Sequence, residues 1–139
     1  MSLFTDTHEI RAALLPQAVS TSGSAAGVWV DTSGADGFCF AVTLGAVEAG
    51  KSVKAELLSS AQAEGGDPKT EGSVTFTAPE GGAENHVICI CGAVSPLRGR
   101  YLSVKVTNVD GESAVQAGAA AILEQRYRPP ETDGTLLVV

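Results

Sequence analysis

The chain has 139 residues, of which 44% are apolar, and sixteen acidic residues against nine basic ones give it a net charge of −7. A chain of this length fits a single domain that buries roughly two-thirds of the surface its unfolded form exposes. The negative charge repels a phosphate backbone, so we expect no nucleic-acid partner. The 16 glycines and 6 prolines, with few long helical patterns, predict an all-β fold.

The sequence carries no signal for export or membrane insertion that we can identify. Asp6, His8 and Glu9 interrupt the N-terminal region, where a signal peptide needs an unbroken apolar segment. No apolar run approaches the ~18 residues of a membrane span. The three cysteines are an odd number, unlike a secreted disulfide framework. We therefore expect a soluble protein made in a reducing compartment, with no membrane partner.

Residues 1–24 differ from the rest of the chain. Asp6 or Thr7 is a candidate cap for a short helix through Ile10, Ala13 and Leu14, which Pro16 limits to about two turns. The segment then ends in a Ser- and Gly-rich run typical of a linker. This pattern predicts an N-terminal arm outside the main domain.

From Gly27 onward, short strand signals recur at the spacing of about 8–12 residues that is typical of sandwiches and barrels. Two of these runs, 38–44 and 87–91, are apolar at nearly every position, so we expect strands covered on both faces. Residues 61–72 are rich in Gly, Glu, Asp and Pro and are expected to form an exposed loop. The early strands are predicted at 28–30, 38–44, 51–60, 73–78 and 87–91.

The clearest strand lies at residues 100–108, where apolar residues alternate with polar ones and predict one core-facing side. Asp110 and Gly111 follow it, and an Asp-Gly pair after such a run predicts a type I′ hairpin. Residues 114–126 have both helical propensity and a period-two apolar row. Because the hairpin would supply a partner strand, we predict a strand there.

Pro129 and Pro130 then end the sheet, and residues 135–139 form an apolar tail. The predicted architecture is a single-domain antiparallel β-sandwich, or jelly-roll-like fold. Its expected parts are an arm at 1–24, the sandwich at 25–128 and a C-terminal tail at 129–139.

The cysteines are the only candidate metal ligands with suggestive spacing. Cys89 and Cys91 are two apart, so their thiols point to one face of a strand, and Cys39 can reach that layer from a neighbouring strand. Three thiolates suit zinc, with His86 as a conceivable fourth ligand. The intervening isoleucines favour the alternative, a buried strand in which free cysteines pack as small hydrophobes. We expect all three to be reduced, buried and free of metal.

No constellation of residues predicts catalysis. His8 and His86 lack a nearby Ser or Cys elbow motif. The glycine pairs at 65–66 and 81–82 lack the flanking strand and helix of a phosphate-binding loop. The loop carboxylates do not alternate as calcium ligands do. We therefore predict no catalytic residue, no cofactor and no metal site, and a small hydrolase or metal enzyme is disfavoured.

Four segments together resemble a group of small structural proteins of tailed bacteriophages. They are an extended piece before a polar turn, a lysine-containing strand, an Arg-Tyr-apolar strand and an Ala-rich strand, at residues 30–33, 51–60, 100–107 and 119–123. In this order they resemble capsid decoration, or cement, proteins, over roughly residues 27–128. The resemblance implies a β-sandwich or jelly-roll module that binds the outside of a head shell and stiffens it.

The resemblance also implies partners and a location. They are the major capsid protein, further copies of the chain as a dimer or trimer, and the exterior of the virion after synthesis in the host cytoplasm. The alternative is a tail-associated or host-surface-binding module, which calls for exposed aromatic residues. Trp29, Tyr101, Tyr127 and four phenylalanines are the aromatic side chains of the sequence, and we expect most of them to be buried.

Both ends of the chain are predicted to make the contacts with the shell. An apolar terminus left in water is an aggregation hazard, and its β-branched residues suit addition to an exposed sheet edge. In the alternative, residues 135–139 complete their own sandwich. The predicted interface residues are Leu3, Phe4, Ile10, Leu14, Leu136, Val138 and Val139.

Overall fold

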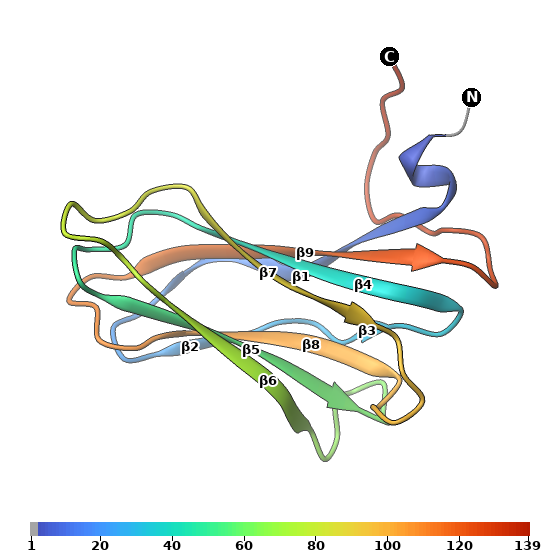
Figure 1. The fold of residues 1–139 in the computed structure, drawn as a ribbon, viewed down its shortest axis with the longest axis horizontal. Coiled ribbons are helices and arrows are strands. Elements are labelled where there is room, and N and C mark those ends of the chain that lie inside the picture. The colour runs from blue at the N-terminus through green and yellow to red at the C-terminus, as the bar shows by residue number, and fades with distance from the viewer. Residues whose placement is uncertain (1–2) are drawn as a thin grey trace.

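The computed structural model describes residues 3–139, and within that range the chain forms nine β-strands and one short 3-10 helix. No helix among these residues is long and apolar enough to cross a membrane. The strands pack as two layers (Figure 1), so the predicted all-β antiparallel sandwich is confirmed. The elements are η1 (Phe4–Asp6), β1 (His8–Val19), β2 (Ser24–Ala26), β3 (Val30–Asp31), β4 (Ala35–Leu44), β5 (Ser52–Ser60), β6 (Lys69–Thr77), β7 (His86–Ala93), β8 (Tyr101–Asn108) and β9 (Val115–Gln125).

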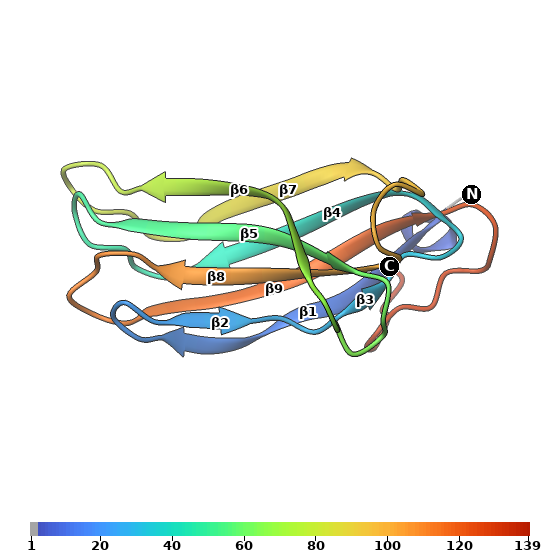
Figure 2. The same ribbon diagram turned by 90° about the horizontal axis from the view of Figure 1, so that it is seen from below.

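The chain passes repeatedly from one layer to the other, as in a jelly roll. Sheet A has the order β1-β9-β4-β7, and sheet B has the order β2-β8-β5-β6, with β3 also pairing with β8. All the pairings between these strands are antiparallel. Figure 2 looks onto sheet B with sheet A behind it, and the strands of both sheets run along the long axis of the molecule. Both sheets therefore have an edge on the same side, at β7 and at β6.

The core lies between the sheets and is built by alternating residues. Leu102, Val104 and Val106 of β8 are at most 2% exposed, which confirms the predicted core side of that strand. Phe40 and Leu123 of sheet A are both 0% exposed. Since a period-two pattern sends alternate side chains to opposite faces, each strand of sheet A leaves its other set of side chains on the outside.

The predicted N-terminal helix is wrong. Residues 8–19 form β1, an edge strand of sheet A that pairs with β9. Pro16 does not end the strand, because it lies between Leu14 and Gln17, where the register with β9 shifts, and an edge strand tolerates proline at such a bulge. The expected arm is thus part of the sandwich from residue 8 onward, while residues 1 and 2 lie outside the described range.

The predicted hairpin between β8 and β9 is also wrong, although residues 115–125 do form the predicted strand. β8 pairs within sheet B and β9 within sheet A, so the connection crosses between layers. Neither Asp110 nor Gly111 has the positive φ that a type I′ turn requires. Instead, Asp110 accepts a hydrogen bond from the Ser52 backbone N–H (2.8 Å), and this contact ties the connection to β5.

The two strands predicted to be covered on both faces are covered on one. In β4, Phe38 and Phe40 are buried and Cys39 is half-buried. In β7, Ile88 is buried while Cys89 and Cys91 are exposed, because β7 is the edge strand and nothing packs outside sheet A there. The expectation that all three cysteines are buried is therefore wrong.

Candidate functional site

The outer face of sheet A is almost free of charge. Strand register aligns its outward side chains in rows that cross all four strands. One row is Ile10, Ile122, Cys39 and Cys91, and the next is Ala12, Ala120, Ala41 and Cys89. A third row contains Gly118, Thr43 and Val87. We call these side chains together the apolar face.

Charged side chains reach the apolar face only at its rim, as far as residues 3–139 are concerned. The row beyond Ile10 and Ile122 pairs His8 with Glu124. Two hollows of about 380 and 400 Å³ lie along the face, one beside Cys39 and Cys91 and the other beside Ala12 and Ala120. Monomeric proteins rarely expose a large contiguous apolar surface unless it binds something.

The two ends of the described chain lie close together (Figure 1). At the N-terminal end, the Phe4 ring stacks on His8 with 3.9 Å between ring centroids. At the C-terminal end, the Asp133 backbone N–H donates to the Ile10 carbonyl oxygen (2.8 Å), and Arg11 pairs with the Asp133 carboxylate (3.0 Å). Both ends therefore meet at the β1 edge of sheet A.

Glu9 anchors this junction from inside. Its side chain is 0% exposed and accepts hydrogen bonds from Arg128 (2.9 Å), Arg11 (3.0 Å) and the Glu131 backbone N–H (2.8 Å). Burial alone would raise the pKa of Glu9, but these hydrogen bonds outweigh it and lower the pKa below its usual value of 4.5. The charged carboxylate thus joins β1 to the start of the tail.

The structure divides the predicted interface residues into separate groups. Phe4 is 55% exposed, and Leu3 and Ile10 are half-buried, with Ile10 on the apolar face. Leu14 is 2% exposed and packs in the core, so we withdraw it as an interface residue. The tail residues Leu136, Val138 and Val139 are exposed and belong to no strand, so they do not complete this chain's own sandwich.

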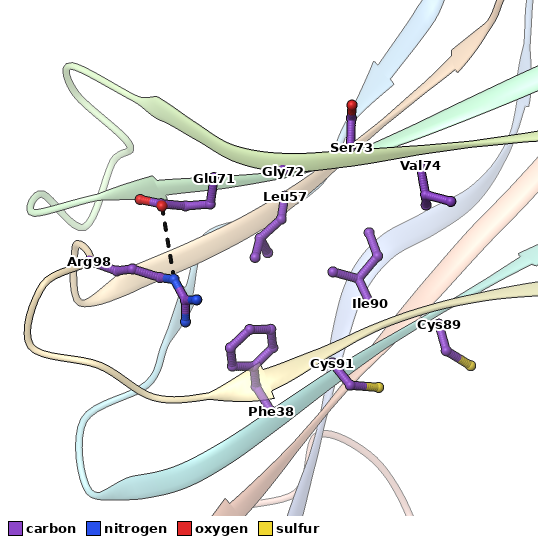
Figure 3. Close-up of a pocket in the computed structure, with 10 residues that line it drawn as sticks. All are labelled: Phe38, Leu57, Glu71, Gly72, Ser73, Val74, Cys89, Ile90, Cys91 and Arg98. Atoms are coloured by element: carbon purple, nitrogen blue, oxygen red, sulfur yellow. Dashed lines mark ion pairs between the residues drawn. The ribbon is translucent and has the colours of Figure 1, made fainter.

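A second concave site lies at the open side of the sandwich, between the edge strands β6 and β7 (Figure 3). Its volume is about 300 Å³. Phe38, Leu57 and Ile90 form its apolar floor. Arg98 and Glu71 close one end, with 3.9 Å between Nε and Oε2, and the Arg98 guanidinium lies 5.9 Å from the centre of the Phe38 ring.

The structure also shows where the candidate zinc ligands lie. The three cysteines do share the outer side of sheet A, and the Cys91 and Cys39 sulfur atoms are 2.7 Å apart. The His86 ring instead stacks on Phe76, with 3.6 Å between ring centroids. Residues 3–139 contain no group of three or more His, Cys, Asp or Glu side chains arranged to hold a metal ion.

Comparisons with known proteins bear on the fold. No protein-family model matches the chain, and no curated protein matches its sequence. The solved structure of PBSX exported protein XepA is similar over 100% of this chain, with a TM-score of 0.60 and 12% identity. This chain spans 44% of XepA. The likeness to XepA is one of fold.

Two further solved structures align with most of this chain. Dimeric latent PorU from Porphyromonas gingivalis aligns over 87% of this chain and 13% of PorU, with a TM-score of 0.50 and 14% identity. A CBM36-1 domain of a multidomain xylanase from the hindgut metagenome of Trinervitermes trinervoides aligns over 83% of this chain and 95% of that domain. The TM-score of this alignment is 0.48 and the identity is 9%.

Sequence reasoning missed most of the apolar face. The sequence did contain a signal for it, because uncharged residues occupy every second position at 39–43 and again at Ala120 and Ile122. It became a site only when the register placed β9 between β1 and β4. The Glu9 junction was also missed, because Arg128 and Glu131 lie more than a hundred residues away in the chain.

Proposed function

We propose that this chain is a structural virion protein that binds the outer surface of a tailed-phage head and stabilises the shell. The apolar face is the observation that carries the proposal, because it offers an almost uncharged surface that extends across the strands of sheet A. The resemblance of the strand segments to capsid decoration proteins supports the same role. The proposal includes no catalytic activity, cofactor, nucleic acid or membrane.

In this proposal the occupant of the apolar face is an apolar surface of the major capsid protein. The net charge of −7 keeps free subunits apart before they meet the shell. The exposed apolar tail residues add contacts between neighbouring copies, which associate as dimers or trimers on the virion exterior. Synthesis takes place in the host cytoplasm.

A matched pair of variants tests the use of the apolar face. Val87 is 47% exposed on that face, whereas Thr75 is exposed on the outer side of sheet B, in register with Lys54. We expect Val87→Glu to weaken the affinity for purified phage heads, measured by co-sedimentation, by about tenfold or more, equivalent to ~1.4 kcal/mol. Thr75→Glu adds the same charge and should leave binding unchanged. Equal binding by the two variants contradicts the proposal.

The site between β6 and β7 supports a second candidate, a tail-associated or host-surface-binding module. Its apolar floor and its pair of opposite charges, Arg98 and Glu71, are typical of small binding sites. Electron microscopy of purified virions separates the two candidates. Density for this chain on the shell supports the first, density on the tail supports the second, and its absence from virions contradicts both.

A further inference from the structure

Three thiols meet on the apolar face, and the proposed function uses them only as apolar surface, not for their chemistry. Cys39 lies on β4, and Cys89 and Cys91 lie on the neighbouring edge strand β7. All three are free thiols. Figure 3 shows Cys89 and Cys91 pointing away from Ile90, to the outer side of the strand. The cluster is therefore open to reagents in solution.

Strand register distinguishes the two possible partners of Cys39. Cys39 lies directly opposite Cys91, whereas Cys89 lies opposite Ala41. Directly opposed residues of antiparallel strands have Cα atoms about 4.5–5.5 Å apart, within the range that a disulfide spans. A diagonal neighbour is about 7–8 Å away, beyond that range. The geometry therefore favours Cys39 with Cys91, whose sulfur atoms are already in contact at 2.7 Å.

We propose that Cys39 and Cys91 form a site of reversible disulfide exchange with low-molecular-weight disulfides, and that the bond fastens edge strand β7 to β4. The hollow of about 380 Å³ beside the two sulfur atoms, which Phe4, Ile122 and Glu124 also line, gives a small disulfide room to approach. Cys89 remains a free thiol on the same face.

The exposure of the two sulfur atoms sets the order of the steps. Cys91 is exposed and attacks first, as its thiolate, so that its sulfur joins one half of the small disulfide and the other half leaves as a thiol. The Cys39 sulfur then attacks the Cys91 sulfur, gives its proton to water, and displaces the second half as a thiol. The two protein thiols lose two electrons and two protons, and the small disulfide gains them.

Cys39 is poorly suited to the first step, the attack on the small disulfide. It is half-buried, and burial, together with contact with Cys91, raises the pKa of the Cys39 thiol to about 12. Cys39 therefore stays protonated near neutral pH and does not compete for the reagent. Closure should become faster as the pH rises, because a larger fraction of Cys39 is then thiolate.

Thiol counting in the full chain tests the site. The fully reduced protein is incubated with oxidised glutathione, and the remaining thiols are alkylated and counted by mass spectrometry. We expect the intact mass to show one internal disulfide, as a loss of two hydrogen atoms without added glutathione on Cys39 or Cys91, while exposed Cys89 stays alkylatable or carries glutathione. Three alkylated thiols after the incubation, or a bond between two copies of the chain, overturns the proposal.

Matched variants identify the partners. Cys89→Ser should still lose both of its remaining thiols to the disulfide, whereas Cys91→Ala should retain no internal bond and end as a mixed disulfide or as free thiols. Both changes are at exposed positions, so both variants are expected to fold. If Cys89→Ser abolishes the internal bond, or Cys91→Ala still forms one, the assignment of Cys39 to Cys91 is wrong.

Discussion

Glu9 shows how one buried charge organises both ends of the chain. Its carboxylate is 0% exposed and is shared between Arg11, Arg128 and the Glu131 backbone N–H. A buried charge is tolerated only when it is paired and hydrogen-bonded, and removing one partner from such a group is costly. Glu9 therefore contributes to stability through the groups that it brings together.

We expect Glu9→Gln to lower the free energy of unfolding by about 1–3 kcal/mol, because the charge-assisted hydrogen bonds from both arginines are weakened. Urea unfolding at neutral pH measures the change. Glu112→Gln is the control, since it makes the same change of charge at an exposed position. An equal loss of stability in both variants would show that net charge, not the Glu9 junction, is responsible.

The same residue predicts a pH dependence. The folded pKa of Glu9 is lowered from 4.5, so its contribution is complete above pH 4.5 and is lost as the pH falls through the folded value. Asp31, whose pKa is lowered to about 2 mainly by the Arg100 guanidinium, acts in the same direction at lower pH. We expect stability to fall with acidification below 4.5, and to fall less steeply in Glu9→Gln. Parallel curves for the two proteins would contradict the assignment.

At the scale of elements, the crossing from β8 to β9 depends on Asn108. This side chain is 1% exposed; its amide donates to the carbonyl oxygens of Ser113 (2.9 Å) and Val19 (3.3 Å), and its oxygen accepts from the Gly111 N–H (3.1 Å). Its side chain thus gives hydrogen-bond partners to backbone groups on both sides of the crossing. The connection can therefore leave sheet B without leaving buried backbone groups unpaired.

We expect Asn108→Ala to lower the free energy of unfolding by about 2–4 kcal/mol, because buried backbone groups lose their partners and a small cavity remains. Thermal unfolding monitored by circular dichroism measures it. Thr107→Ala, on the half-buried outer side of the same strand, should change stability by well under half as much. A loss for Asn108→Ala no larger than that of Thr107→Ala would exclude the proposed role.

The strands should also differ in their protection from hydrogen exchange. β8 and β9 each lie between two paired strands, whereas β6 and β7 each have a free edge. We expect the amides of β6 to exchange at least about tenfold faster than those of β8, since edge strands open locally at lower cost. Exchange of the dilute protein followed by NMR gives the rates. Uniform rates across β6 and β8 would indicate that the edge is covered.

For the whole molecule, the tail has an attached part and a free part. Residues 131–133 contact β1 through hydrogen bonds to Glu9 and Ile10 and an ion pair with Arg11. Residues 135–139 are exposed and lie outside the strands. The contacts of the tail with β1 thus end before the apolar residues 135–139 begin.

Two truncations separate these parts. Deleting 134–139 should leave the melting temperature of the isolated subunit unchanged, because these residues add little packing. Deleting 131–139 should lower it by several degrees, roughly the effect of 1–2 kcal/mol in a domain of this size. Calorimetry of both proteins measures the difference. A marked drop for the shorter deletion would show that the apolar end stabilises the subunit itself, which would weaken its assignment to subunit contacts.

Local patterns in the sequence were enough to predict the class of the fold and the core side of its clearest strand. The period-two pattern of residues 102–106 is a local property of the chain, and it holds whichever strands lie beside it. Tertiary structure decided which strands pair. It placed β1 against β9 instead of leaving a helical arm, and it sent β9 to the sheet opposite β8. It also left the cysteines of β7 on the outside, because only the position of a strand within its sheet decides which of its apolar faces is covered.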